Sequence, residues 1–249
     1  TEGTLPADLD MTQKAIVLYS SGGNNGGFKN LMIEDLTKAP EETGDFTASY
    51  VDNKGNATDL SADLDASFKA YKTTNNTVDT TVGDTVESVW NQLPGSSVAD
   101  SGFANSFLTP KHRDENGQKS LLAYTGETPA SSRITAEIAY HGTQYGIAIV
   151  DRSVLETGTI NVDDGLTVRL SINENGSNIL RIRGLGINNS FPNISDLPDA
   201  KVDQATANKT YTLKVEIADG KVTAWIDGCA TKTEGTLPAD LDMTQKAIV

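Results

Sequence analysis

The sequence is poor in the residues that many catalytic and metal sites require. Its 249 residues include one cysteine, Cys229, and two histidines, His112 and His141. One cysteine cannot close a disulfide within the chain, so we expect Cys229 to be buried or half-buried, with an inter-chain disulfide as the alternative. No HxxxH or CxxC pattern indicates a zinc site, and no GxSxG pattern indicates a nucleophile elbow.

Positive charge and long apolar runs are also scarce. The 20 Lys and Arg residues face 34 Asp and Glu residues, which gives a formal net charge of −14. Phosphate backbones are bound by Lys and Arg, so the composition excludes a general nucleic-acid binder. No stretch approaches the about 20 apolar residues that span a bilayer, so we expect no membrane span in this segment. The acidity favours solubility and self-repulsion in a crowded surface layer, with divalent-cation binding as the alternative.

The sequence does contain a long repeat. The 17 residues TEGTLPADLDMTQKAIV occupy positions 1–17 and again 233–249, so the period is 232 residues. A fixed period determines the architecture of a chain. In one interpretation the chain samples a tandem array. In the other, a subunit donates its N-terminal strand to a neighbour and a copy of that strand has been fused to the C-terminus. The junction CATKT at residues 229–233 has no Gly/Ser linker, which favours the array.

Alternation of apolar and polar residues, typical of half-buried strands, dominates the second half of the chain. We predict strands at residues 134–141, 145–151, 166–173, 178–184, 210–218 and 221–227. Only Asp219-Gly220 separates the last two, and such a pair is a strong hairpin signal because a type I′ turn needs positive φ at both positions. This region is therefore predicted to be antiparallel β without a long helix.

The first half of the chain is less uniform. Strands are predicted at residues 14–20, 28–35 and 46–52. The Gly-rich loop at residues 21–27 precedes a strand and not a helix, so we interpret it as a hairpin connection and not as a phosphate-binding loop. Residues 60–72 fit both a strand and one face of a helix, and we favour the strand.

The hairpin at residues 210–228, TYTLKVEIADGKVTAWIDG, resembles the signature hairpin of concanavalin A-like (laminin G-like) β-sandwiches. The resemblance implies an all-β fold, an antiparallel β-sandwich of the concanavalin A-like jelly-roll type. In that family two closing strands follow the hairpin, and residues 14–35 resemble that pair. We therefore expect a sandwich completed across the repeat junction. The expected domains are residues 1–37 for the closing strands, 38–94 for a small β-rich or linker module, and 95–249 for the main body, with 233–249 as the start of the next repeat.

The same family includes glucanases, whose catalytic acids stand on one strand as Glu-x-Asp-x-(x)-Glu. This pattern is absent from the sequence, so we carry over no catalytic residue and expect no enzyme. Sugar binding, the other common activity of the family, usually requires exposed aromatic side chains. We expect Trp225 to pack in the core of the hairpin and Trp90 to pack in a small satellite core.

The function expected first is that of a structural repeat unit in an extracellular filament or giant cell-surface adhesin. Its partners would be identical neighbouring repeats or subunits, interlocked by shared β-strands. The assembly strand would carry Lys14, Ile16 and Leu18, and the second copy repeats the first two as Lys246 and Ile248. The alternative is a carbohydrate-binding, lectin-like module of a secreted protein with surface glycans as partners. A glycoside hydrolase is disfavoured by the missing carboxylate pattern.

Two loops carry the oxygen-rich side chains that calcium prefers, so calcium is the candidate cofactor. One loop contains Asp52, Asn56 and Asp59, and the other contains Asp163 and Asp164. Ordinary turns are the alternative interpretation, because Asp, Asn and Gly also form turns. Sequons for N-glycosylation stand at Asn56, Asn75, Asn175, Asn188, Asn193 and Asn208.

Overall fold

The computed structural model describes residues 46–75, 77–79, 81, 83, 85–91, 108–110, 118–140, 145–157, 165–171, 178–190, 192, 194–197 and 209–249. The chain divides into two compact units, Thr1–Glu41 and Glu42–Val249, and every described residue lies in the second. The closing strands predicted at residues 14–20 and 28–35 lie outside the described residues, as do both histidines. The described part is mostly β, with antiparallel sheets and a few short helices.

One sheet has five strands in the order β12-β11-β10-β9-β16. Its strands are β9 (Tyr145–Asp151), β10 (Leu166–Ser171), β11 (Ile179–Gly184), β12 (Ile187–Ser190) and β16 (Lys246–Ile248). All of its pairings are antiparallel. The strands predicted at residues 145–151, 166–173 and 178–184 are confirmed, with small differences in their ends, whereas β12 was not predicted.

A second sheet has four strands in the order β15-β14-β13-β8. Its strands are β8 (Ser132–Tyr140), β13 (Lys209–Ala218), β14 (Lys221–Ile226) and β15 (Lys232–Thr236). The predicted hairpin is confirmed, because β13 and β14 pair from Ala218 and Lys221 outward. Asp219 and Gly220 turn the chain with φ values of 50° and 69°, as a type I′ turn requires.

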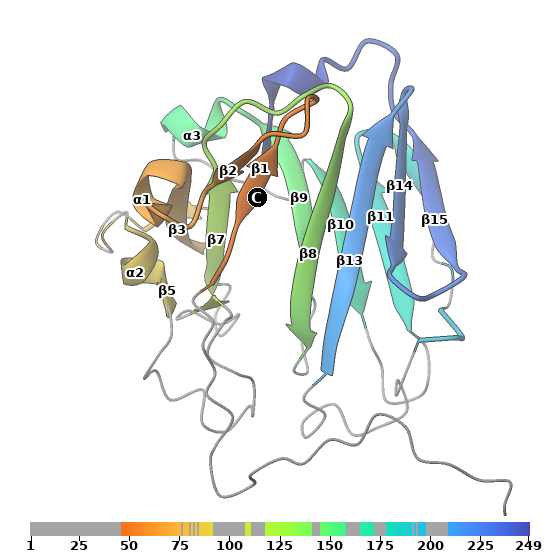
Figure 1. Ribbon diagram of the computed structural model, residues 1–249, viewed down its shortest axis with the longest axis horizontal. Coiled ribbons are helices and arrows are strands. Elements are labelled where there is room, and N and C mark those ends of the chain that lie inside the picture. Colours follow the sequence, from red (N-terminus) through yellow and green to blue (C-terminus); the bar gives the residue numbers. More distant parts are fainter. Residues whose placement is uncertain are drawn as a thin grey trace, which may run out of the picture. The chain divides into compact units, whose positions relative to one another are not determined.

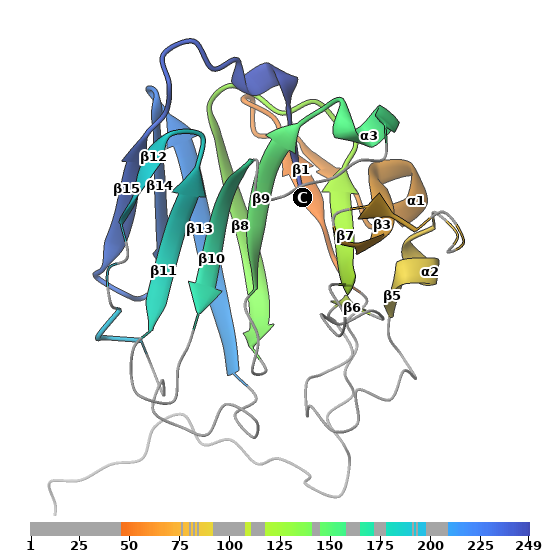
Figure 2. The same ribbon diagram turned by 180° about the vertical axis from the view of Figure 1, so that it is seen from behind.

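These two sheets face each other around one hydrophobic core (Figures 1 and 2). The five-stranded sheet supplies the buried residues Ile147, Ile149, Leu166, Val168, Leu170, Leu180 and Ile182. The four-stranded sheet supplies Ile138, Tyr211, Leu213, Val215, Ile217, Val222, Ala224 and Ile226. Cys229 also packs in this core and is 8% exposed, as expected for a lone cysteine. Alternation along each strand therefore forms a two-layer structure in which apolar side chains from both sheets exclude water.

A three-stranded sheet, β4-β3-β7, accompanies the two main sheets. Here β3 (Phe68–Thr74) pairs along β7 (Gln118–Tyr124), and the short β4 (Thr77–Val78) pairs with the end of β3. The sheet contains strands from both sides of the predicted domain boundary at residue 94. Two small pairings complete the described β structure: β1 (Ser49–Val51) with β2 (Ala57–Asp59), and β5 (Trp90–Asn91) with β6 (Thr109–Pro110).

The described helices are short. They are α1 (Leu64–Ser67), α2 (Val86–Val89), α3 (Val154–Thr157) and the 3-10 helix η4 (Met243–Gln245). The strand predicted at residues 60–72 is wrong where the chain forms α1, and it is confirmed from Phe68 onward, where β3 begins. Asp63 caps α1, because its Oδ1 accepts a hydrogen bond of 3.0 Å from the backbone N–H of Ala66. None of the helices in the described part of the chain is long and apolar enough to cross a membrane.

A small satellite core lies beside β3. It contains Leu64, Ala70, Val86 and Val89, with Trp90 packed against it, so the expectation for Trp90 is confirmed. The indole Nε1 of Trp90 donates a hydrogen bond of 3.2 Å to the carbonyl oxygen of Leu121 on β7. This bond satisfies the polar atom of a part-buried indole.

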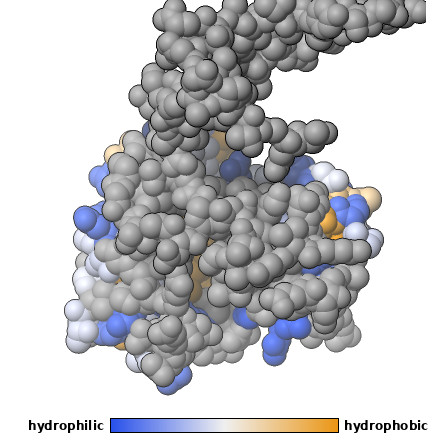
Figure 3. Space-filling view, turned by 90° about the horizontal axis from the view of Figure 1, so that it is seen from below, coloured by the Kyte–Doolittle hydropathy of each residue, from blue (hydrophilic) through white to orange (hydrophobic). Residues whose placement is uncertain are grey.

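Hydrophilic side chains are prominent on the surface of the described residues. Figure 3 shows blue and pale residues around the rim of one face, with orange residues between them. Among the described residues, Val51 is the one large hydrophobic residue recorded as exposed, at 57%. A contiguous apolar surface patch is the usual sign of a docking site. Among the described residues, large apolar side chains are therefore almost all at least partly buried.

Candidate assembly site

The second copy of the repeat is built into both main sheets. We call residues 233–249 the strap. Its first residues form most of β15 beside β14, and its last residues form β16 beside β9. The ribbon passes over one end of the sheets between these two strands (Figures 1 and 2). Because β14 and β9 belong to different sheets, the strap connects the two layers and forms one edge of each.

The first half of the strap is anchored on the four-stranded sheet. Thr233 and Leu237 are 1% and 6% exposed, and the backbone N–H of Leu237 donates a hydrogen bond of 2.8 Å to the carbonyl oxygen of Gly220. Gly235 lies against Ile187 of β12, where an added Cβ would come within 2.7 Å of the Ile187 Cγ2. Glycine is therefore required there unless Ile187 moves, and the same glycine recurs in the first copy as Gly3.

The crossing between the sheets ends in the one-turn helix η4. Its N-cap is Asp242, whose Oδ1 accepts hydrogen bonds from the backbone N–H and the Oγ1 of Thr244 at 2.9 and 2.6 Å. Both bonds hold the pKa of Asp242 below its ordinary value, and the bond from the Thr244 hydroxyl has the larger effect. Met243 points into the main core and is 6% exposed. A capped turn thus inserts one apolar side chain between the sheets.

The last residues of the strap form an edge strand of the five-stranded sheet. Lys246, Ala247 and Ile248 stand opposite Asp151, Val150 and Ile149. The ladder continues one residue further, because Val249 and Ala148 exchange backbone hydrogen bonds of 2.8 and 2.7 Å.

Side chains of β16 alternate between the two faces of this sheet. Ile248 packs against the main core, whereas Ala247 and Val249 pack with Ala148 and Val150 on the other face. The strand therefore packs against apolar side chains on both faces, and its register is specified by its apolar pattern.

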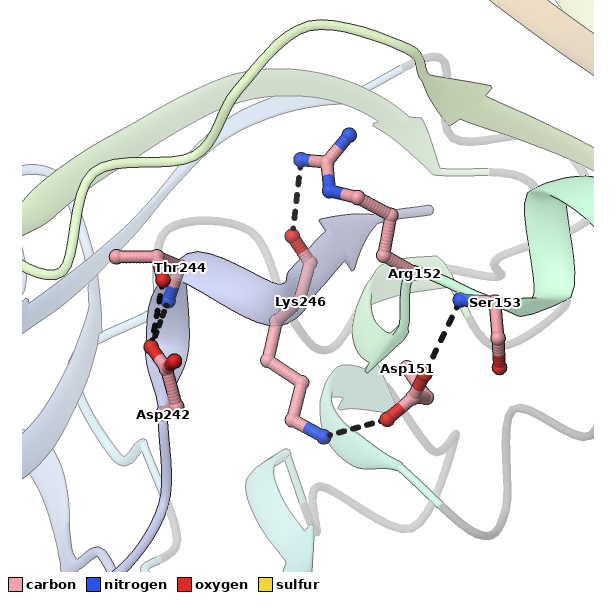
Figure 4. Close-up of polar contacts among 6 residues, drawn as sticks. All are labelled: Asp151, Arg152, Ser153, Asp242, Thr244 and Lys246. Carbon is pink, nitrogen blue, oxygen red and sulfur yellow. Dashed lines mark hydrogen bonds and ion pairs between the residues drawn. The ribbon is translucent and has the colours of Figure 1, made fainter.

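Polar contacts fasten this strand at its first residue (Figure 4). The Nζ of Lys246 lies 3.2 Å from the Oδ2 of Asp151, its cross-strand partner. The backbone N–H of Ser153 donates to the Oδ1 of Asp151 at 3.0 Å. This bond is the largest cause that holds the pKa of Asp151 below its ordinary value of 3.8, followed by the Ser153 side chain and Lys246. The carboxylate is therefore charged and correctly placed to pair with the lysine of the strap.

Arg152 connects the strap to a neighbouring loop. Its backbone N–H donates a hydrogen bond of 2.9 Å to the carbonyl oxygen of Gln245, and its Nη2 donates one of 3.2 Å to that of Lys246. The same guanidinium donates to the carbonyl oxygens of Thr125 at 3.1 Å and Gly126 at 2.7 Å. One part-buried side chain thus binds three backbone acceptors from two distant parts of the chain.

The structure places only some of the predicted assembly residues. Lys246 and Ile248 both lie in β16, whereas Lys14, Ile16 and Leu18 lie outside the described residues. Sequence reasoning missed the acceptor side, Asp151 and Arg152. One signal was available: Asp151 ends a predicted strand, and its charge is opposite to that of the lysine in the repeat.

The described calcium candidates are engaged in turns. The Oδ1 of Asp52 accepts the backbone N–H groups of Lys54 and Asn56, both at 2.8 Å, and its Oδ2 accepts the Asn56 side-chain amide. Asp59 accepts hydrogen bonds from the backbone and hydroxyl of Ser61. Within the described ranges no three His, Cys, Asp or Glu side chains come together as a metal site. The calcium hypothesis therefore gains no support there, and Asp163 and Asp164 lie outside the described residues.

Three of the six sequons fall on described residues. Asn56 and Asn75 are exposed in turns, and Asn188 lies in β12. Asn175, Asn193 and Asn208 lie outside the described residues. Glycosylation therefore stays a prediction, with Asn56 and Asn75 sterically accessible for it.

Trp225 is not in the core, so the expectation for this residue is wrong. Its neighbours Ala224 and Ile226 are buried in the sandwich, and alternation turns the indole to the opposite face. The Nζ of Lys232 lies 4.5 Å from the centre of the ring, in a cation–π contact. Because Lys232 lies over the ring of Trp225, only the rest of the ring surface is open to a sugar.

Comparison with known proteins identifies no family. No family model matches the chain, and no curated protein matches it. Two solved structures are distantly similar. A native glycosidic hydrolase has 10% identity and a TM-score of 0.35, over 72% of this chain and 80% of that chain. A beta-glucanase of Bacillus licheniformis has 11% identity and a TM-score of 0.34, over 72% and 82%. The class that the sheets themselves define is a mostly β protein with two facing antiparallel sheets.

Proposed function

We propose that the protein is a structural unit of an extracellular filament or giant cell-surface adhesin, in which successive units share β-strands. One observation carries the proposal. The strap forms an edge of both main sheets, and the same 17 residues stand at positions 1–17. Identical side chains in identical order have the same complementarity to the strap site. A second copy of the chain therefore presents a segment that fits the site now filled by the strap.

Physical chemistry favours the use of such a segment. An antiparallel sheet without its edge strand exposes unpaired backbone groups, which attract another strand. Addition of that strand from a neighbour is β-augmentation, in which main-chain bonds give affinity and alternate side chains give specificity. Leu237, Met243 and Ala247 are 6%, 6% and 0% exposed, so the site also buries apolar side chains of the segment.

The geometry of exchange would produce a chain of units. The donor segment and the acceptor edges are different surfaces of the protein, so each contact is heterologous. Heterologous contacts that do not close a ring form open filaments. In this proposal the sandwich is of the concanavalin A-like type, and residues 14–35 supply its closing strands across the junction between units.

The surface and the sequence pattern fit a mechanical role better than a catalytic one. The chain carries a formal net charge of −14, which keeps a densely packed extracellular layer hydrated. No Glu-x-Asp-x-(x)-Glu pattern occurs in the sequence. Glu216, a lone carboxylate on β13, is hydrogen-bonded by the Nε of Arg133 at 2.9 Å and so serves the sheet.

The same substitution in the two copies tests the proposal. Ile248→Asp puts a carboxylate into the main core beside Ile149, so it should release β16 and open the acceptor site. We expect this variant to polymerise, as measured by sedimentation velocity and negative-stain electron microscopy. The double variant with Ile16→Asp loses the donor as well and should stay monomeric.

The controls separate opening of the site from general unfolding. Circular dichroism should show that Ile248→Asp keeps its sheet content, and Ile16→Asp alone should match the unaltered chain in melting temperature. A folded Ile248→Asp protein that remains monomeric at high concentration would argue against shared strands. Polymers that form equally well in the double variant would show that the first copy is not the donor.

A further inference from the structure

The backbone of Gly235 does not explain why this residue of the strap is a glycine. Glycine is the default where φ is positive, and Gly235 does not have a positive φ. Glycine also weakens a strand, because it has no side chain to pack. The surroundings of Gly235 supply the reason. An added Cβ would lie 2.7, 3.0 and 3.4 Å from the Cγ2, Cδ1 and Cγ1 of Ile187, so the Ile187 side chain fills the space that a side chain at position 235 would need.

Ile187 reaches Gly235 from the other sheet. It belongs to β12, the edge strand of the five-stranded sheet, whereas β15 is the edge strand of the four-stranded sheet. The two strands lie beside each other at one side of the sandwich (Figure 2). Ile187 packs against the main core, and the χ1 angle of a β-branched side chain is stiff, so its Cγ2 cannot move aside easily. The acceptor site therefore contains a fixed apolar projection opposite one position of the strap.

This contact distinguishes registers that alternation cannot separate. A shift of a strand by two residues keeps every side chain on its own face. On the inward face of the strap, Thr233 and Leu237 flank Gly235, and they are 1% and 6% exposed. Gly235 stands opposite Val222 of β14. A shift by two residues in either direction would place Thr233 or Leu237 there, and the Cβ of either residue would clash with Ile187.

We infer that Ile187 selects the strand that one unit receives from the next, because it admits to β14 a segment with glycine opposite Val222 and excludes one with a side chain there. This inference rests on the proposed function. In the first copy of the repeat the glycine is Gly3, and Thr1 and Leu5 take the flanking inward positions. A second copy of this chain therefore carries the required residue in the required place. A clash that rejects other segments is an effective source of specificity.

The strap provides a first test within one chain. Gly235→Val should lower Tm, although valine is a better strand former than glycine. Ile187→Ala removes the clashing atoms, so the double variant should be more stable than Gly235→Val alone. Thr236→Val is the matched control, because it places the same side chain at the next position, which is exposed and points to the outer face, and it should leave Tm almost unchanged. If the losses caused by Gly235→Val and Ile187→Ala simply add, the contact does not select the segment and the inference is overturned.

Polymer formation tests the selection between chains. The open chain carries Leu237→Asp and Ile248→Asp, which place carboxylates at two buried positions of the strap and should release both of its strands. We expect the open chain to polymerise through its first copy, as measured by sedimentation velocity. Addition of Gly3→Val should raise the concentration at which half of the chains are in polymers at least about tenfold. Further addition of Ile187→Ala should reverse this change, whereas Thr4→Val, the matched control in the first copy, should not affect it.

The outcomes separate this inference from the proposed function. Polymers that form equally well with Gly3→Val would overturn the selection by Ile187 and leave the proposed function standing. The same conclusion follows if Thr4→Val is as harmful as Gly3→Val, or if Ile187→Ala does not restore polymers in a chain that circular dichroism shows to be folded. An open chain that is folded and forms no polymers with Gly3 intact would overturn the proposed function, and the inference with it.

Discussion

Replacement of Arg152 by alanine tests how strongly its guanidinium joins the strap to the loop at Thr125 and Gly126. The substitution removes hydrogen bonds to the carbonyl oxygens of Gly126, Thr125 and Lys246 at 2.7, 3.1 and 3.2 Å. A bond from a charged donor contributes about 1.5–3 kcal/mol, and we count the two shortest at the lower value because the side chain is only part-buried. The expected loss in the free energy of unfolding is therefore about 3 kcal/mol. For a domain of this size that corresponds to roughly 6–12 °C in Tm.

Urea unfolding followed by circular dichroism measures this loss, and amide hydrogen exchange locates it. The backbone N–H of Val249, bonded to the carbonyl oxygen of Ala148, should exchange faster in the variant. Arg152→Lys keeps the charge but not the planar guanidinium. Its free energy of unfolding should therefore lie between those of the unaltered protein and Arg152→Ala. Arg183→Ala, at an exposed position on β11, is the control and should change stability by less than about 0.5 kcal/mol. If Arg152→Ala costs no more than this control, the guanidinium does not stabilise the junction between the loop and the strap.

Two further predictions concern pH and the hairpin. The pKa of Asp151 in the folded state lies below its ordinary value of 3.8. The charged carboxylate therefore stabilises the folded state fully above pH 3.8, and this stabilisation is lost as the pH falls through the folded pKa. The unaltered protein should therefore exceed Asp151→Asn in Tm at neutral pH, and the two should converge in acid; a constant difference would contradict the ion-pair argument. Gly220 has a φ of 69°, so Gly220→Ala should cost about 1 kcal/mol in urea unfolding, whereas an unchanged midpoint would contradict the type I′ turn.

The sequence predicted those strands whose apolar pattern is local. Residues 145–151 alternate and become β9, and Asp219-Gly220 forms the turn that its residue types favour. Strand β15, with the sequence KTEGT, was not predicted because it contains no large apolar residue. It forms because β14 offers an open edge and because Gly235 fits against Ile187, and neither condition is visible in a linear pattern.

The candidate assembly site was predicted only in part for the same reason. The repeat showed that one segment occurs twice, and its alternating residues predicted that Lys246 and Ile248 belong to a strand. The partners of that strand depend on tertiary structure: Arg152 binds backbone carbonyl oxygens of Thr125 and Lys246, which are 27 and 94 positions away. Backbone acceptors have no residue-specific signature, so no motif search would have linked them to an arginine.

Attachment at two strands determines how such a junction would come apart. In the strap, β15 and β16 are separated only by residues 237–245, so release of one strand leaves the other holding the segment in place. The released strand then rebinds at an effective concentration in the millimolar range, as expected for short tethers. If the first copy binds a neighbour in the same way, dissociation requires both strands to open together. Exchange between units should then be slow compared with the opening of either strand, which suits a load-bearing fibre and does not suit a reversible signalling contact.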